Sequence, residues 1–185
     1  MKQHLPVIYR VYDMAKNNLS RPIEQRIGEI HIDAARRKAL RIVAFTGSVF
    51  PGEWTPAFAE DLTLDVIEFA YHARRVNQIC GFEQEEFPPI TNNQVQISEN
   101  DPGSWVERYQ WALNRLVHMD TYVLGYGHVD HRRMYLAAES NLAPLYAKVS
   151  SDKFASETIS LYGLVSCFLV SVIPLVRSHF PDFQV

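Results

Sequence analysis

An uncharged run of eighteen residues, ISLYGLVSCFLVSVIPLV at positions 159–176, constrains the fold of this chain more than any other stretch. Its length is at the lower limit for a transmembrane helix. The same composition suits a core helix that one domain covers on all sides. Tyr162, Gly163 and Pro174 dilute the run, and no basic cluster precedes it. The sequence therefore predicts a buried apolar C-terminal helix and no membrane contact, with a C-terminal membrane anchor as the alternative.

Apolar residues along the rest of the chain recur with the period of α-helices, and 185 residues suit one domain. We therefore predict a single all-α domain over 1–185, a bundle of five or six helices with a long polar connector at 81–103. The expected helices begin at Ser20 and Asp33, cover 56–80, 105–118 and 131–148, and begin again at Ser151.

The helix at 56–80 is the clearest of these, because its apolar residues form one stripe at helical spacing. Its members are Phe58, Leu62, Val66, Phe69, Ala73, Val76 and Cys80.

Near the N-terminus the apolar face changes direction. Ile23, Ile27, Ile30 and Ala34 share one face, whereas the following apolar residues occupy another. This change beside Asp33 predicts a break, with Asp33 capping a second helix that ends near residue 45.

Two further start signals predict helices in the second half of the chain. Ser104 and Glu107 have the spacing of a capping box, and Asp130 can cap the helix at 131–148, which Pro144 would kink. The stretch DTYVLGYG before it predicts a loop or short hairpin.

Charge and cysteine content narrow the function classes. The net charge of -3 gives no global basic field for nucleic acid. Cys80 and Cys167 both fall in apolar helical settings, which is typical of reduced core cysteines in a cytoplasmic protein. No apolar core of signal-peptide length is present in the first residues, so we expect a cytoplasmic location.

A histidine-rich stretch, HMDTYVLGYGHVDHRR, begins at His118. His118, His128, Asp130 and His131 could meet across the loop as a nitrogen and oxygen ligand set for zinc or another divalent ion. The preferred interpretation is that these residues mark helix ends, with Asp130 as a cap, so that the protein needs no cofactor.

A second set of polar residues could support acid–base chemistry. His72 and Arg75 lie beside the apolar stripe of their helix, and Asn114 and His118 lie beside that of theirs. If these two helices pack together, His72, Arg75, Asn114 and His118 form one polar pocket. Such a set can activate an RNA 2′-hydroxyl without metal. The structural alternative is a histidine at the edge of the core, held by Asp65 or Glu68.

The helical layout, with His and Arg set within apolar helices as in FAYHARRVNQIC and ALNRLVH, resembles the HEPN group of small bacterial helical proteins. The resemblance implies a metal-independent ribonuclease of a toxin or antiphage system. The signature of that group is Arg followed by His after four to six residues, near the last helices. In this chain the only such pair is Arg26 and His31, near the N-terminus.

The last helix carries a stripe of small residues, which allows close approach of another helix within the domain or in a homodimer. No Walker loop, Rossmann glycine pattern or Gly-x-Ser-x-Gly motif is present. We predict a small bacterial interaction or regulatory module that binds another protein or itself through a helical face. The alternatives are a HEPN-like ribonuclease that acts on RNA and a metal-binding helical protein. The stripe consists of Ser160, Gly163, Cys167, Ser171, Pro174 and Ser178.

Overall fold

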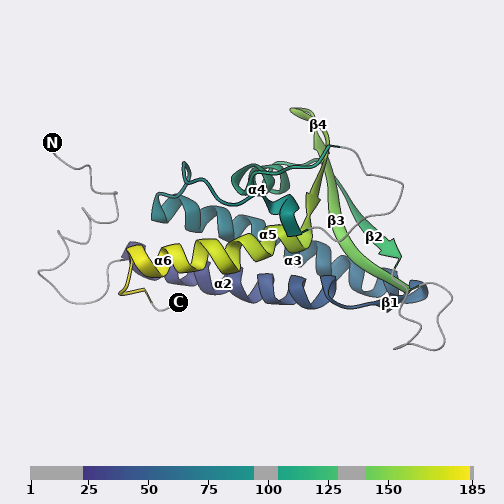
Figure 1. Ribbon diagram of the computed structural model, residues 1–185, viewed down its shortest axis with the longest axis horizontal. Helices are drawn as coiled ribbons and strands as arrows, with labels where there is room; N and C mark the ends of the chain where they lie inside the picture. Colours follow the sequence, from purple (N-terminus) through teal and green to yellow (C-terminus); the bar gives the residue numbers. More distant parts are fainter. Residues whose placement is uncertain (1–22, 94–103, 129–140, 184–185) are drawn as a thin grey trace, which may run out of the picture.

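The computed structural model describes residues 23–93, 104–128 and 141–183, and within them helices pack beside a small antiparallel sheet (Figure 1). The helices are α2 (Ile23–Thr46), α3 (Thr55–Cys80), α4 (Tyr109–Val117), α5 (Leu161–Cys167) and α6 (Ile173–His179), with short 3-10 turns at Gly52–Trp54 and Ile90–Asn93. The strands are β1 (Phe50–Pro51), β2 (Thr121–His128), β3 (Asn141–Ser151) and β4 (Phe154–Ser160). The predicted all-α helical bundle is therefore wrong, because a four-stranded sheet forms part of the fold.

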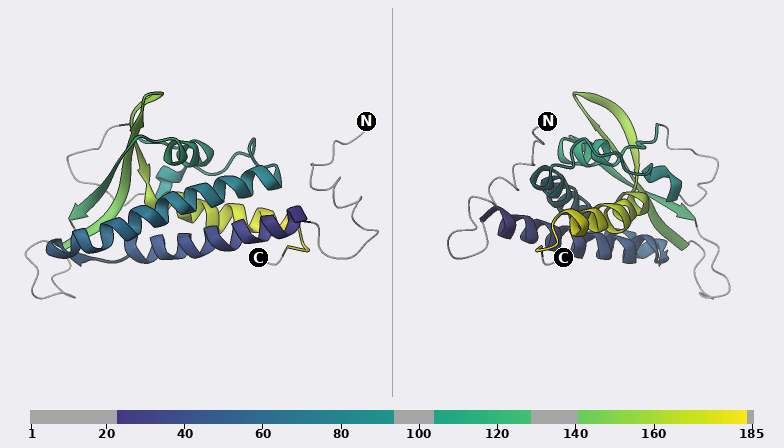
Figure 2. Two further views of the ribbon diagram at one scale, coloured as in Figure 1. Left: turned by 180° about the vertical axis from the view of Figure 1, so that it is seen from behind. Right: turned by 60° about the vertical axis from the view of Figure 1, so that its left-hand side comes forward.

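α2 and α3 form a long antiparallel hairpin (Figure 2). The predicted break in α2 is absent: Asp33 lies within one continuous helix of 24 residues and pairs with Arg37 at 3.1 Å. The buried face of α2 carries Ile32, Ala39 and Ile42, and the first apolar face points to solvent. The break was predicted because both faces are apolar, although only one of them meets the core.

α3 confirms the clearest helix of the sequence. All seven residues of its predicted stripe are buried. Pro56 occupies the first turn, where its missing N–H has no intrahelical partner to lose. Gly81 ends the helix at φ 73°, a left-handed conformation that favours glycine.

The apolar C-terminal run forms a continuous helix in which a π turn at Phe168–Val172 joins α5 to α6. Pro174 follows that turn. Its nitrogen cannot donate a hydrogen bond to the preceding turn, and the wider backbone of the π turn accommodates this. Only one side is buried, since Tyr162 and Val170 are 43% and 68% exposed. By length and composition Leu161–His179 could cross a membrane, but a core helix passes the same test and half of its most apolar window is buried.

The small-residue stripe is covered within the domain at Gly163. The carbonyl oxygen of Ile90 lies 1.8 Å from the position that a Cβ at Gly163 would occupy. Only glycine allows this approach of the residue 81–93 segment to α5. Farther along the stripe, Pro174 and Ser178 are exposed.

β3 is the central strand of the sheet. It pairs with β2 along one edge and with both β1 and β4 along the other. Pro144 lies between the stretches that pair with β1 and β4, next to a bulge opposite Gly125 and Tyr126. Proline is tolerated in a strand only where its missing N–H is not needed. The predicted helix at 131–148 is therefore wrong from residue 141 onward, and residues 131–140 lie outside the described part.

Two other predicted helix starts are also wrong. Ser104 does not cap a helix; its carbonyl accepts from Thr158 N–H at 2.8 Å, so this segment pairs with β4, and α4 begins at Tyr109. Ser151 begins no helix, because β4 follows and Ser160 caps α5 instead.

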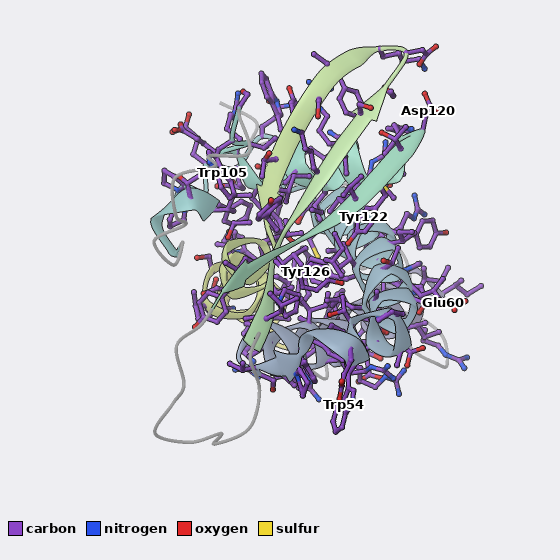
Figure 3. The ribbon with its side chains drawn as sticks, turned by 90° about the vertical axis from the view of Figure 1, so that its right-hand side faces the viewer. Trp54, Glu60, Trp105, Asp120, Tyr122 and Tyr126 are labelled. Atoms are coloured by element: carbon purple, nitrogen blue, oxygen red, sulfur yellow. The ribbon has the colours of Figure 1, made fainter. Side chains whose placement is uncertain are left out.

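Figure 3 shows the sheet end of the molecule, where Trp54 projects away from the helices.

We expect Gly163→Ala to destabilise the protein by about 1–3 kcal/mol, because the new methyl group must displace the Ile90 backbone. Val170→Ala, on the exposed side of the same helix, should change the free energy of unfolding by less than about 0.5 kcal/mol. Urea denaturation measures both. Equal stability of Gly163→Ala and the unmodified chain would contradict the close approach.

Candidate functional site

A buried carboxylate lies between α2 and α3. The Asp65 side chain is 2% exposed, and Lys38 Nζ lies 2.9 Å from its Oδ1. Arg41 Nε lies 2.7 Å from Oδ2 and forms an ion pair with it. The hydrogen bond with Asp65 is the main cause of a raised pKa of Lys38, and Lys38 in turn lowers the pKa of Glu68. This network compensates one buried charge and holds the two helices in register.

Two histidines meet along the same interface. His31 Nδ1 and His72 Nδ1 are 2.8 Å apart, so one nitrogen donates a hydrogen bond and the other accepts it. Tyr71 lies beside both rings. Burial is the main cause of a lowered pKa of His31, and the charges of His72 and Arg75 lower it further. Burial also lowers the pKa of His72, against the opposing effect of Glu68.

The sequence predicted that the partner of His72 is His118, and the structure places His31 there instead. In the sequence His31 stands out only as the histidine of the Arg26–His31 pair. The sequence contains a signal for the contact of His31 with His72. His31 and Lys38 are seven residues apart, as are Asp65 and His72. In an antiparallel helix pair this spacing brings both pairs into contact at once.

The four predicted catalytic residues divide between two sides of α3. His72 and Arg75 lie on the side of His31, and Arg75 donates to Gln78 at 2.7 Å. Asn114 lines a hollow on another side of α3, between α3 and α4. His118 follows α4, and its backbone N–H donates to the Asn114 carbonyl at 3.1 Å. No contact described among these residues joins His72 or Arg75 to Asn114 or His118.

The predicted metal ligands lie largely outside the described residues. His118 is exposed at the end of α4, whereas Asp130, His131 and the side chain of His128 are not described. Within residues 23–93, 104–128 and 141–183, no group of three or more His, Cys, Asp or Glu side chains is placed to hold a metal ion. Metal binding by the histidine-rich stretch therefore stays a prediction.

Both cysteines are buried and free. Burial raises the pKa of Cys80 and of Cys167 to about 12. Thiols with so high a pKa are protonated at neutral pH, which makes them poor nucleophiles and poor metal ligands.

Comparisons with models of protein families, with curated proteins and with solved structures find no match to this chain. The resemblance to the HEPN group therefore stays a prediction.

The histidine pair predicts a pH-dependent stability. Because folding lowers the pKa of both His31 and His72, the unfolded chain binds protons more readily than the folded one. The contribution to stability is complete above the ordinary pKa of 6.5 and is lost as the pH falls through the lower folded values. His72→Gln should reduce this loss, measured as the melting temperature between neutral and mildly acidic pH.

His118→Gln is the matched control, since His118 has no described contact with the pair. It should retain the full loss of stability on acidification. An identical pH profile for His72→Gln and the unmodified chain would show that the pair does not titrate with folding.

Proposed function

We propose that this chain is an interaction module that works as a homodimer, in which the α2 helices of two copies pack against each other. The observation that carries the proposal is the outward face of α2. Ile23, Ile27 and Ile30 are 72%, 38% and 63% exposed there. Large apolar residues gathered on one exposed face are typical of an interaction surface.

The spacing on this face suits helix pairing. Ile23, Ile27, Ile30 and Ala34 follow each other in steps of four and three residues, and Arg37 and Arg41 continue the same steps. Such alternation keeps one narrow seam facing a partner helix, as in a coiled coil. The seam of α2 is therefore apolar in its first half and basic in its second.

This division into an apolar half and a basic half favours an antiparallel pair of identical helices. A parallel pair would place Arg37 against the partner's Arg37 and Arg41 against the partner's Arg41, so that like charges meet. An antiparallel pair centred between residues 28 and 29 opposes Ile27 to the partner's Ile30. Both arginines then lie beyond the apolar contact.

Flanking charges support the same orientation. Arg26 is exposed on one side of the seam. Asp33 lies on the same side, pairs with Arg37 of its own helix and keeps a side chain that is 48% exposed. In the antiparallel arrangement Arg26 lies near the partner's Asp33, and symmetry creates that pair twice. Each pair contributes more to the orientation of the two helices than to the affinity of the dimer, because exposed ion pairs contribute only about 0–1 kcal/mol.

We expect a dimer in the micromolar range by analytical ultracentrifugation, because the apolar contact spans only four seam positions. Ile27→Glu and Ile30→Glu should each weaken it at least about ten-fold by burying an uncompensated charge. Leu40→Glu is the matched control: Leu40 is 54% exposed on the same helix but outside the seam. A chain that is monomeric at about 200 micromolar would contradict the proposal.

Charge exchange tests the orientation separately. Arg26→Asp should weaken the dimer, and the double exchange Arg26→Asp with Asp33→Arg should restore it, since opposite charges then meet again. A double exchange no better than the single one would contradict the antiparallel arrangement.

A second candidate function rests on the histidine pair. Two hydrogen-bonded histidines beside Arg75 offer an acid, a base and a cation, the groups that a metal-independent ribonuclease of a toxin or antiphage system requires. His31→Ala and His72→Ala should then each abolish RNA cleavage, by at least about a hundred-fold. His118→Ala should leave it unchanged. A chain that leaves RNA intact in the presence of chelator would exclude this candidate.

A further inference from the structure

A polar hollow of about 390 Å³ lies between α3, α4 and the segment that follows Gly81. It shares no lining residue with the proposed α2 seam or with the histidine pair. Its volume falls within the range of small-molecule sites. The lining residues that bear on a ligand are Arg74, Asn77, Glu83, Arg108, Gln110 and Trp111.

Asn77 indicates that the hollow receives a ligand. This side chain is 3% exposed, and its Oδ1 has no hydrogen-bond partner among the described atoms. Buried carboxamides are nearly always hydrogen-bonded, and an unpaired one destabilises the fold. Because Asn77 lines the hollow, a ligand that carries a hydrogen-bond donor would satisfy its Oδ1.

The rim of the hollow favours an anion. Arg74 and Arg108 contribute two guanidinium groups, against one carboxylate from Glu83. Arg108 is exposed, and its guanidinium carbon lies 5.3 Å from the centre of the Trp111 ring. Guanidinium groups bind phosphate through several hydrogen bonds at once.

An aromatic ring and several amides complete the site. Trp111 is 52% exposed, and the guanidinium carbons of Arg108 and Arg115 lie 5.3 and 5.9 Å from the centre of its ring. A base that stacks on Trp111 shares the ring with these cations. Gln110 donates to the carbonyls of Phe82 and Glu85 at 3.2 and 2.7 Å, so the segment after Gly81 is fastened to α4. The hollow thus has a fixed wall, a stacking surface and a buried carboxamide.

We propose that this hollow binds a nucleoside phosphate, either free or as one unit of a single-stranded nucleic acid. The base edge donates a hydrogen bond to Asn77 Oδ1 through an exocyclic amino group such as that of adenine. The base lies against Trp111, and the phosphate lies between Arg74 and Arg108. This combination of amides, aromatic ring and cations fits a base joined to a phosphate better than an acidic peptide, which would use the cations alone. The proposal does not rest on dimer formation.

Titration of the full-length chain tests the site, with tryptophan fluorescence and calorimetry as readouts. Adenosine monophosphate should bind saturably, and adenosine and inorganic phosphate should each bind at least about ten-fold more weakly. A short oligoadenylate distinguishes the two sources of the ligand. Tighter binding of the oligonucleotide than of the mononucleotide identifies a strand, and the reverse identifies a free nucleotide; both support the site.

Variants connect the binding to the named residues. Arg74→Ala and Arg108→Ala should each weaken binding about ten-fold. Arg177→Ala, which changes an exposed arginine on α6 outside the hollow, should leave binding unchanged. Asn77→Leu should abolish binding and leave the melting temperature unchanged or higher, because it removes an unpaired buried polar group. A lower melting temperature would instead indicate a structural role for Asn77.

Three results would overturn the proposal. They are no saturable binding of the mononucleotide or the oligonucleotide at millimolar concentration, equal weakening by Arg177→Ala and Arg108→Ala, and tighter binding of an acidic peptide than of either nucleotide probe.

Discussion

The contact of α2 with α3 is the constraint on which the rest of the structure depends. Asp65 is a carboxylate buried between two helices, and it is compatible with folding only where Lys38 and Arg41 reach it. One register of the helix pair satisfies this condition, and the same register brings His31 to His72. Other elements are then placed relative to the pair, because α4 packs on α3 and α5 packs on α2.

The parts of the fold that could be predicted are those with local causes. The stripe of α3 repeats over about six turns, and Gly81 marks the end of the helix, so the whole helix follows from neighbouring residues. The sheet has no such local cause. Residues 141–148 include Leu and Ala, which favour helices, and their strand conformation depends on pairing with residues far away in the sequence.

The candidate sites show the same limit. His72 and Asn114 could be identified as polar residues beside apolar faces, but which residues they meet depends on how their helices pack. A helix presents successive residues at steps of about 100°, so α3 turns His72 toward α2 and Arg74 toward α4. One helix therefore supports two polar regions on different sides. The outward face of α2 led to the wrong prediction of a helix break at Asp33 for a related reason. An isoleucine that ends up exposed cannot be distinguished by its residue type from one that is buried.

The position of Pro144 has a consequence for how the sheet opens. β3 pairs with β2 along nearly its whole length, but its other edge is interrupted between Leu142, which lies opposite the start of β1, and Tyr146, which lies opposite the end of β4. Pro144 stands in that interruption and contributes no amide to bridge it. The contacts with β1 and with β4 can therefore break independently, as two separate units of local unfolding. Fraying of the short β1 contact, beside the α2–α3 turn, would leave the β4 ladder and the start of α5 in place.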